Sequence, residues 1–357
     1  MSNPVVSVCV PTYNGGAFLA LTLKSIAAQT FEGYEVVIVD DHSTDDSVAL
    51  AEQYAASDPR VKLLQPSERA GSSARNANRC LQHARGEWIK FIFQDDVMAP
   101  DCLASLLDAT RNGRRFALSW HNYTFEPGVD DKTRAFYETL PTLRTVFSGP
   151  YVAPGDLCEA VFAHCFRNLI CNFLGPTSSS FLHRECFAQY GAFSSEILGF
   201  PDLEYWIRVG GNEGLAIVPA YLVTFRVHAK SISAGFRNSK DTYRHMLERV
   251  LLYCDLALAP EYAPMRAYLR ERTPALDANE MLIKQARAAR WHAIDVKYRN
   301  NVLSLLERWE NFARMHPRIV ALLRDADRAQ PLSVRVKSFL SSWIKQHSSL
   351  SISRDSK

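Results

Sequence analysis

Two pairs of adjacent acidic residues end apolar runs within the first hundred residues of the chain. Asp40 and Asp41 close the run "YEVVIVDD", and Asp95 and Asp96 close the run "KFIFQDD". Neighbouring carboxylates repel one another and raise each other's pKa unless a cation or hydrogen-bond donors compensate. Mg²⁺ and Mn²⁺ bind one or two carboxylates together with the oxygens of a diphosphate. The two pairs therefore indicate a divalent cation site for a diphosphate, although Asp40 and Asp41 alone are equally typical of helix caps.

The elements that must position these acids alternate between strands and helices. Short β-branched apolar runs predict strands near residues 5–10, 34–39, 61–65 and 87–93, and helical patterns lie near 17–29, 45–56, 72–84 and 100–111. Ser43 or Thr44 is expected to cap the second of these helices. The alternation is typical of a parallel sheet covered by helices on both faces. Because ligands of such sheets bind at the carboxyl ends of strands, we expect both acidic pairs on one rim.

The remainder of the chain is patterned differently. Residues 116–176 give no clear assignment, whereas residues 177–233 contain a short strand, a helix over Leu203–Val209 and an apolar run from Leu215 to Val227. Helical spacing dominates after Gly235. Residues 1–240 carry 21 Lys and Arg against 25 Asp and Glu, whereas residues 241–357 carry 20 against 13. This asymmetry predicts a second, helical body with different partners.

Composition limits the classes of protein to which the chain can belong. The 357 residues are 47% hydrophobic, which is sufficient for a globular core. No stretch approaches the roughly 18 apolar residues of a membrane span, and the first apolar run is too short for a signal peptide, so we expect a cytoplasmic protein. No nucleic-acid-binding motif accompanies the basic residues, so we expect no nucleic-acid partner. The eight cysteines include no CxxC pair and are expected to be reduced, mostly buried thiols.

A series of motifs runs in order through residues 5–235. In chain order the motifs are "VSVCVPTYNGG", "VVIVDDHSTDDS", "GSSARNAN", "KFIFQDDVMAPDCL", "PTSSSFLHRECFAQYG", "GFPDLEYWIRV" and "FRVHAKSIS". Together they resemble the inverting glycosyltransferases of family 2, which have the GT-A fold, of the bacterial surface-polysaccharide type. Several ordered motifs are far more specific than a single short one.

The resemblance implies a fold, a domain organisation and an activity. The fold is α/β: a Rossmann-like, mostly parallel sheet with helices on both faces, followed by a C-terminal helical appendage. The expected catalytic domain spans residues 1–235, with a nucleotide-sugar half to about 125 and an acceptor half after it; the appendage spans 236–330. The expected activity is inverting, metal-dependent transfer of a sugar from a nucleotide-diphospho sugar to a saccharide hydroxyl. A UDP-sugar is favoured, in synthesis of lipopolysaccharide O-antigen, capsule or another surface glycan.

Donor-binding residues carry over from the motifs. Tyr13 resembles the aromatic residue that lies against the nucleotide base, and Pro11 and Thr12 would shape that wall; the alternative is a tyrosine that only packs. Asp41 resembles the carboxylate that accepts a hydrogen bond from a uracil ring nitrogen, with Asp40 more structural. Arg75 is similar to a basic residue near the donor phosphates, or it is a solvated arginine on a helix surface.

The metal site is expected around the motif "QDD". The resemblance assigns Asp95 to the donor sugar or ribose and Asp96 to Mn²⁺ or Mg²⁺. Gln94 stands where other members often have an acid, so the ion preference is open. His228 in "FRVHAKSIS" is similar to a histidine near the diphosphate or metal, and Arg226 is a candidate phosphate ligand.

The transfer also requires a base that takes the proton of the acceptor hydroxyl. In "FPDLEYWIRV" the resemblance puts Asp202 at the position of this base, with Pro201 in place of the usual preceding acid. Glu204 is the alternative base, and either residue alone is also typical of a helix cap. Partial burial beside Phe200, Tyr205 and Trp206 would raise the pKa of such a base toward neutrality.

The last part of the chain, residues 331–357, contains the amphipathic pattern "PLSVRVKSFLSSWIKQHSS". Over 331–347 this pattern fits a basic helix lying on an anionic membrane, and equally a helix packed on its own protein or on a second subunit of a homo-oligomer. If it meets a membrane, a lipid-linked saccharide is the natural acceptor.

Two rival functions remain open at this point. A sugar-phosphate nucleotidyltransferase also uses a nucleotide-binding α/β domain and acidic metal ligands, but it is expected to carry a Gly-rich loop with a basic residue, which "PTYNGGAF" lacks. A catalytically inactive sugar-binding or scaffold subunit of a polysaccharide assembly complex is the second rival, because Pro201 replaces an acid.

Overall fold

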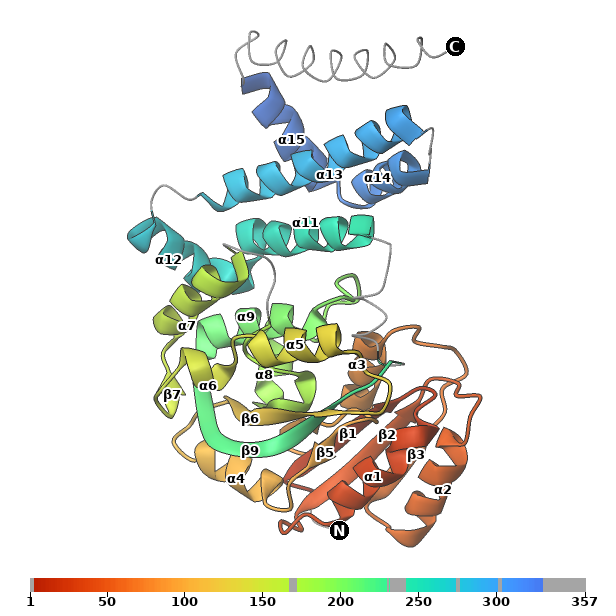
Figure 1. Cartoon of the computed structure of the whole chain (residues 1–357). Coiled ribbons are helices and arrows are strands. Elements are labelled where there is room, and N and C mark those ends of the chain that lie inside the picture. The colour runs from red at the N-terminus through yellow and green to blue at the C-terminus, as the bar shows by residue number, and fades with distance from the viewer. Residues whose placement is uncertain are drawn as a thin grey trace. The chain divides into compact units, whose positions relative to one another are not determined.

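The computed structural model describes residues 3–166, 172–229, 231, 242–273, 277–300 and 304–329. The chain divides into two compact units, and Figure 1 shows their elements. The first unit comprises Met1–Ser239 and Pro260–Tyr268, and the second comprises Lys240–Ala259 and Leu269–Lys357. The chain therefore returns to the first unit once, whereas the sequence pattern predicts a single boundary near residue 235.

Four parallel strands form the N-terminal half of the sheet, in the order β3-β2-β1-β4. The strands are β1 Val6–Thr12, β2 Tyr34–Asp40, β3 Val61–Leu64 and β4 Trp88–Phe91; the helices between them are α1 Gly16–Ala27, α2 Ser47–Ser57 and α3 Ser73–His83. Every residue of β1 and β2 is buried, as expected for strands covered on both faces. The predicted alternation is confirmed, with each boundary within two residues.

The second half of the sheet is mixed and continues in the order β8-β6-β9-β5, with β7 also paired to β9. Its strands are β5 Val97–Met98, β6 Phe116–Phe125, β7 Tyr151–Val152, β8 Ser180–His183 and β9 Leu215–Val227. β8 is antiparallel to β4 and β6, and β5 and β7 are antiparallel to β9, whereas β6 and β9 are parallel. Six of the nine strands therefore run in one direction, and the expectation of a mostly parallel sheet is confirmed.

The segment without a sequence assignment folds into short elements. It contains β6 and β7 with the helices α5 Asp131–Thr139, α6 Leu143–Val146 and α7 Pro154–Val161. After it follow a turn of 3₁₀ helix at Thr177–Ser179, then α8 Arg184–Tyr190 and α9 Pro201–Glu213; α4 Cys102–Ala109 lies earlier in the chain. Only the first residues of β6 are continuously buried, and its later residues are mixed, which explains why no clear period is visible in the sequence.

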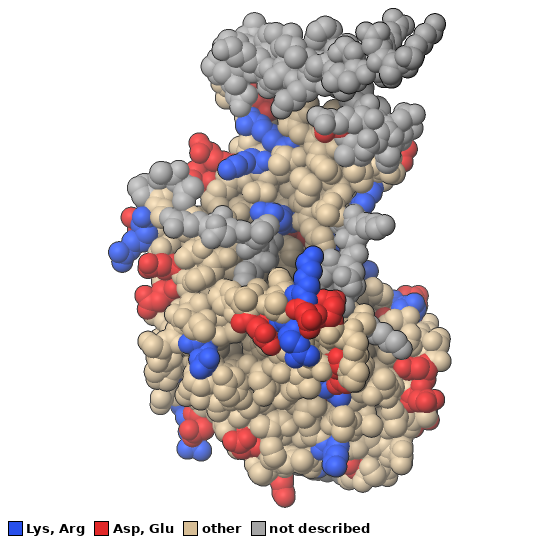
Figure 2. All heavy atoms as spheres, viewed as in Figure 1, with Lys and Arg blue, Asp and Glu red and all other residues tan. Residues whose placement is uncertain are grey.

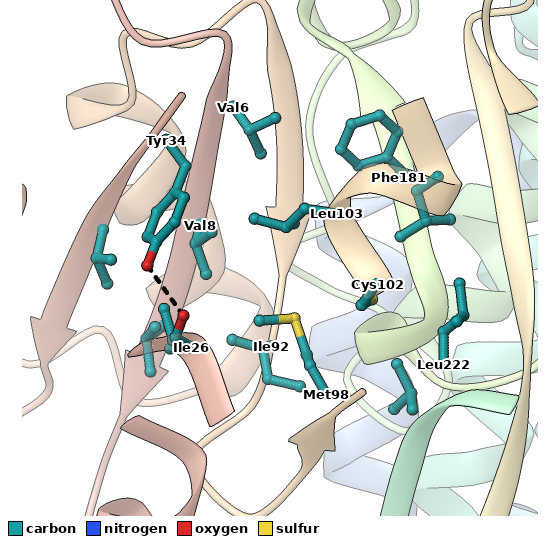
Figure 3. Packing of buried hydrophobic residues seen from close by; sticks show 14 of the residues in the cluster. Val6, Val8, Ile26, Tyr34, Ile92, Met98, Cys102, Leu103, Phe181 and Leu222 are labelled. Atoms are coloured by element: carbon teal, nitrogen blue, oxygen red, sulfur yellow. Dashed lines mark hydrogen bonds between the residues drawn. The ribbon is translucent and has the colours of Figure 1, made fainter. Parts of the chain in front are cut away.

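An apolar core fixes the N-terminal half of the sheet against its helices. Val6, Val8 and Val10 of β1 pack in one cluster with residues of α1 and α4, and the Tyr34 hydroxyl donates a hydrogen bond of 2.9 Å to the carbonyl of Ile26 (Figure 3). Burial of such side chains contributes roughly 25 cal/mol per Å² of apolar surface. The core therefore holds the ends of β1 and β2 in one place.

The start of α2 differs from the sequence prediction. The capping position is Asp46, and no side chain caps it. Ser43 instead binds Asp40, and its hydroxyl accepts a 2.8 Å hydrogen bond from the backbone amide of Asn14. Thr44 donates its amide to the Asn14 carboxamide oxygen at 2.8 Å. These two residues therefore join the loops after β1 and β2 rather than capping the helix.

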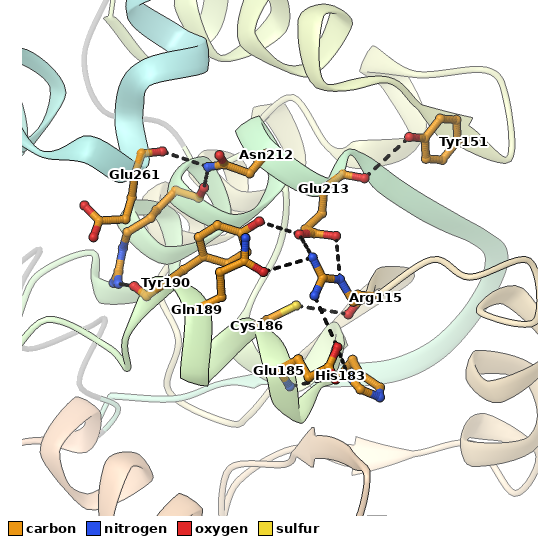
Figure 4. Close-up of polar contacts among 11 residues, drawn as sticks. Arg115, Tyr151, His183, Glu185, Cys186, Gln189, Tyr190, Asn212, Glu213 and Glu261 are labelled. Atoms are coloured by element: carbon orange, nitrogen blue, oxygen red, sulfur yellow. Dashed lines mark hydrogen bonds and ion pairs between the residues drawn. The ribbon is translucent and has the colours of Figure 1, made fainter.

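A polar network anchors the C-terminal end of α9. The guanidinium of Arg115 forms a bidentate ion pair with the Glu213 carboxylate (Figure 4). The Tyr190 hydroxyl donates to the same carboxylate, and the main-chain carbonyl of Glu213 accepts a further hydrogen bond. Asn212 donates a 2.7 Å hydrogen bond to the carbonyl of Glu261, which belongs to the returning segment of the first unit. Bidentate charged pairs fix geometry strongly. The network holds α9, whose first turn carries Asp202.

The second unit is helical, as expected. Its helices include α11 Thr242–Leu258, α13 Ala278–Asn300, α14 Ser304–Met315 and α15 Pro317–Ala329, while α12 Ala263–Arg272 begins in the first unit and ends in the second. Arg287 and Arg290 both pair with Asp327 at 2.9 Å. The predicted amphipathic helix at 331–347 lies outside the described residues. None of the helices within the described ranges is long and apolar enough to cross a membrane.

Acidic and basic side chains are interspersed on the face of the molecule drawn in Figure 2. On the first unit, Arg111 pairs with Asp108 at 3.1 Å, and both side chains are exposed. Exposed pairs of this kind contribute about 0–1 kcal/mol each. The energetically important charges are therefore the buried ones around the strand ends.

Candidate active site

The ends of β1, β2 and β4 meet at one edge of the sheet. The backbone amide of Asp41 donates to the carbonyl of Thr12 at 2.8 Å. The Gln94 carboxamide accepts from the amide of Tyr13 at 2.7 Å and donates to its carbonyl at 2.9 Å. Gly15 leaves room for this contact, because a Cβ there would lie 2.4 Å from the Gln94 side chain. Gln94 therefore joins two loops of the rim, and both ends of its carboxamide are engaged.

Asp95 and His228 face each other across this edge. Nε2 of His228 lies 3.0 Å from Oδ2 of Asp95, and the imidazole packs against the Phe18 ring at 4.2 Å. The Asp95 side chain is 21% exposed. Nδ1 of His228 is buried and has no hydrogen-bond partner among the described residues. β9 ends at Val227, so the C-terminal end of this long strand delivers the histidine to the acidic pair.

Asp96 points to the interior instead. Its residue is 1% exposed, its Oδ2 accepts a hydrogen bond from the Ser178 hydroxyl, and its Oδ1 accepts one from the Arg226 amide at 3.3 Å. Burial raises the pKa of the Asp96 carboxyl well above its usual range, Asp95 raises it further, and the Ser178 hydroxyl lowers it. The geometry differs from the expectation that Asp96 meets a metal ion, since Asp95 is the accessible carboxylate of the pair.

Arg226 supports the same turn from the side of β9. Its Nε donates to the carbonyl of Asp95, and its Nη2 donates to the carbonyl of Phe18 at 3.0 Å. The guanidinium also lies 4.9 Å from the Phe18 ring. The guanidinium of Arg226, the expected phosphate ligand, is thus already hydrogen-bonded to two backbone carbonyls. Burial lowers the pKa of Arg226.

The expected base-binding residues lie at the end of β1. Pro11 and Thr12 are buried in the strand, whereas Tyr13 is 40% exposed. The Arg69 guanidinium lies 4.3 Å from the centre of the Tyr13 ring, a cation–π contact. Only Tyr13 of these three offers a ring face to a ligand.

Asp41 is buried and held by three donors. Its carboxylate accepts hydrogen bonds from the amides of Ala70 and of Gly71, the latter at 3.0 Å, and pairs with Arg79 at 3.2 Å. The expected basic residue Arg75 is exposed on α3 and donates to the carbonyl of Ser195 at 3.0 Å. Arg79, one helical turn later, is therefore the arginine that contacts an acid of the rim.

Asp202 and Glu204 begin α9 but differ in environment. Burial raises the pKa of Asp202 to about 6, while hydrogen bonds from the Leu203 amide and the Asn172 side chain lower it. Glu204 is 2% exposed, and its carboxylate binds the Arg208 guanidinium at 2.8 and 2.9 Å and the Tyr262 hydroxyl at 2.8 Å. Of the two, only Asp202 has a carboxylate without a cationic partner among the described residues.

One segment connects Asp202 to the acidic pair. The Asn172 carboxamide binds the backbone of Gly175 at 2.9 and 3.2 Å, and the Gly175 carbonyl accepts from the Trp206 indole at 3.2 Å. Gly175 has a φ of +110°, which favours glycine. Three residues later Ser178 binds Asp96. The segment 172–178 therefore ties the helix that carries Asp202 to the turn that carries Asp95.

Three residues that contact the acids of the site are not indicated by the sequence. Ser178 lies within the motif "PTSSS", but nothing in its type or spacing distinguishes it from its serine neighbours. Arg79 and Asn172 likewise have ordinary surroundings in the sequence. The signal that identifies all three is a buried acid that needs donors, and the partner of such an acid is visible only after folding.

The residues present fit a divalent ion at Asp95 and His228. Two ligand atoms that bind an octahedral ion at about 2.1 Å and at a right angle lie about 3.0 Å apart, which matches the distance between Oδ2 and Nε2. Within the described part of the chain no group of three or more His, Cys, Asp or Glu side chains is arranged to hold a metal. The remaining ligands would therefore come from substrate oxygens and water, as is usual for Mg²⁺ and Mn²⁺.

Comparison with known proteins identifies the family. Residues 7–161 match the model of "Glycosyl transferase family 2". An uncharacterized protein of Mycobacterium tuberculosis, MT1568, is 30% identical over 255 residues, which are 68% of this chain and 75% of that protein.

Solved structures share the fold at lower identity. S. aureus TarS 1-349 in complex with UDP-GlcNAc has a TM-score of 0.56 and 18% identity over 89% of this chain and 83% of that chain. The mannosyltransferase PcManGT from Pyrobaculum calidifontis, in complex with GDP-Man and Mn²⁺, has a TM-score of 0.51 and 20% identity over 90% of this chain and 86% of that chain. At these identities the likeness establishes the GT-A fold. The chain belongs to glycosyl transferase family 2 and is a glycosyltransferase enzyme.

Proposed function

We propose that the enzyme transfers a sugar from a nucleotide-diphospho sugar, with a UDP-sugar favoured, to a saccharide hydroxyl with inversion at the anomeric carbon. The observation that carries the proposal is the pair of the partly exposed Asp95 with the buried His228, joined through one segment to the half-buried Asp202. A surface glycan is the proposed product class. The family membership favours this reading over a nucleotidyltransferase or an inactive scaffold.

The donor nucleotide is proposed to lie across the ends of β1 and β2. The exposed Tyr13 ring offers a face for the base, and stacking on an aromatic ring contributes roughly 1–3 kcal/mol. A carboxylate has about four acceptor positions, so Asp41 can still accept one ring N–H beside its three protein donors. The binding of UDP-GlcNAc stated for S. aureus TarS supports a uridine donor.

The diphosphate is proposed to lie beside Asp95 and His228, which would hold a Mn²⁺ or Mg²⁺ ion with one carboxylate oxygen and one ring nitrogen. Such an ion supplies Lewis-acid stabilisation of the negative charge on the departing diphosphate. The Mn²⁺ stated for PcManGT supports a divalent ion. The role of Asp96 is then to anchor the turn from within through Ser178 and the Arg226 amide.

Asp202 is the proposed base. Its carboxylate accepts the proton of the acceptor hydroxyl as that oxygen attacks the anomeric carbon, and the bond to the diphosphate oxygen breaks with its electron pair leaving on the diphosphate. One displacement inverts the configuration and needs no covalent intermediate on the enzyme. Glu204 is unsuited to this role because Arg208 and Tyr262 already occupy its carboxylate.

The test is release of nucleoside diphosphate from a panel of UDP-, dTDP- and GDP-sugars by the purified full chain in Mn²⁺. Slow hydrolysis of one donor, abolished by EDTA and by Asp95→Ala, is the expected result. Binding of a donor without turnover, under conditions replete in saccharide acceptors, would contradict the proposal and favour a sugar-binding subunit.

A further inference from the structure

A fully buried lysine lies directly behind the acidic pair. Lys90 occupies the middle of β4, where it is aligned with Val8 of β1 and Phe181 of β8, and it is 0% exposed. Lysine is almost never fully buried unless its charge is paired. The strand itself does not require a charge here, because an apolar residue would make the same backbone pairings with β1 and β8.

The ammonium of Lys90 is directed at the segment that supports the site. Its Nζ donates to the carbonyl of Ser178 and, at 3.0 Å, to the carbonyl of Phe91. Burial lowers the pKa of Lys90, while Asp96 acts in the opposite direction through its charge. The buried ammonium and the buried carboxylate of Asp96 are thus neighbours joined by one residue.

Ser178 is the joining residue, and both its carbonyl and its hydroxyl are hydrogen-bonded. Its carbonyl accepts from Lys90, its hydroxyl donates to Asp96, and the same hydroxyl accepts from the amide of Phe93 at 3.1 Å. A single buried serine therefore fixes a cation, an anion and the backbone where β4 ends. Charged hydrogen bonds are shorter and stronger than neutral ones, so this arrangement is stiff.

Hydrogen bonds from two sides restrain the turn that carries Asp95. Thr22 donates to the carbonyl of Gln94 at 2.7 Å and to that of Asp96 at 2.8 Å, which holds the turn from α1. Ser178 holds the same turn from the opposite segment through Phe93 and Asp96. With Asp96 anchored inward, Asp95 is the carboxylate left to face His228.

We propose that Lys90 and Ser178 are positioning residues of the metal site, which fix the Asp95–Asp96 turn and thereby set the affinity for the divalent ion. The inference rests on the proposed function, because it requires that Asp95 and His228 bind the ion. Residues that orient metal ligands from behind typically change metal affinity 10- to 100-fold when they are replaced.

A purely structural lysine would behave differently. Removing the Lys90 ammonium leaves the buried carbonyls of Ser178 and Phe91 without this donor and destabilises the fold. In that case Lys90→Met would change the melting temperature but leave the affinity for Mn²⁺ as it is in the wild type. Metal affinity therefore separates the two roles.

The test is titration of MnCl₂ into the full chain in saturating UDP, with bound Mn²⁺ measured by electron paramagnetic resonance. Lys90→Met and Ser178→Ala are each expected to raise the Kd for Mn²⁺ about 10- to 100-fold. Lys62→Met is the matched control, because it makes the same change at an exposed position of β3, and its Kd is expected to equal that of the wild type.

Two further measurements keep the outcome decisive. Near-ultraviolet circular dichroism reports whether each variant is folded; if Lys90→Met is not, Ser178→Ala decides, since it removes only the hydroxyl. Values within twofold of the wild type in the folded variants overturn the inference while leaving the proposed function intact. Absence of Mn²⁺ binding by the wild type itself in UDP would instead refute the proposed metal site and, with it, this inference.

Discussion

Replacement of Asp202 by asparagine should reduce transfer strongly while stabilising the fold at alkaline pH. Asparagine keeps the shape and an oxygen that accepts from the Leu203 amide, 2.8 Å away in the wild type, but it cannot take a proton. Loss of a positioned general base typically lowers the rate 10²- to 10⁴-fold. We expect a decrease in kcat of this size at pH 7.5.

The stability change follows from the raised pKa. Burial raises the pKa of Asp202 from 3.8 to about 6. The folded state therefore binds this proton more tightly than the unfolded state, so the associated stability is fully present below pH 3.8 and is lost as pH rises through 6. A shift of about two units corresponds to at most about 3 kcal/mol. Asp202→Asn should raise the free energy of unfolding at pH 8 by up to that amount and have little effect at pH 4.

The wild-type pH profile is the kinetic counterpart. A base with a pKa of about 6 is about nine-tenths ionised at pH 7 and about one-tenth at pH 5, so kcat/KM should fall roughly tenfold between them. The assay is release of nucleoside diphosphate in excess Mn²⁺ from pH 5 to 8, with urea unfolding of both proteins. Asp101→Asn, at the exposed start of α4, is the control. A flat profile from pH 5 to 8, or full activity in Asp202→Asn, would show that Asp202 is not the base.

Three more predictions follow from other parts of the structure. Glu204→Gln should lower the free energy of unfolding by about 3 kcal/mol in urea titrations, because it leaves Arg208, whose side chain is only 11% exposed, without its anion; loss of activity without loss of stability would mark Glu204 as the base instead. Tyr13→Ala should raise the KM for the donor at least fivefold with kcat unchanged, whereas Tyr13→Phe should match the wild type, and equal effects of both would contradict base stacking. Removal of residues 331–357 should release the enzyme from membrane fractions, and unchanged partitioning would count against membrane contact by that segment.

Much of the fold could be predicted because its signals are local. The strands at Val6–Thr12 and Tyr34–Asp40 are buried on both faces, so they read as continuous apolar runs that end at the rim. The acids after these runs then mark one edge of the sheet whatever the rest of the chain does. Residues 116–176 gave no such pattern, because short helices and a partly exposed strand carry no sustained period.

The division of roles within the site could not be predicted from the sequence. Asp95 and Asp96 are the same residue type at adjacent positions, and only Ser178, far away in the chain, draws Asp96 inward. The availability of the Glu204 carboxylate likewise depends on Tyr262, a residue far away in the chain that belongs to the segment returning to the first unit. Sequence spacing identifies which residues reach a site, whereas long-range partners decide which of their atoms remain available.

Pulsed electron paramagnetic resonance of Mn²⁺ bound to the wild-type chain with UDP tests most directly whether Asp95 and His228 together hold the divalent ion. The predicted spectrum contains a ¹⁴N coupling from a directly bound imidazole that disappears in His228→Ala, while Mn²⁺ binding is lost in Asp95→Ala. A spectrum without imidazole nitrogen, or Mn²⁺ binding that survives Asp95→Ala unchanged, would show that these two residues do not hold the ion.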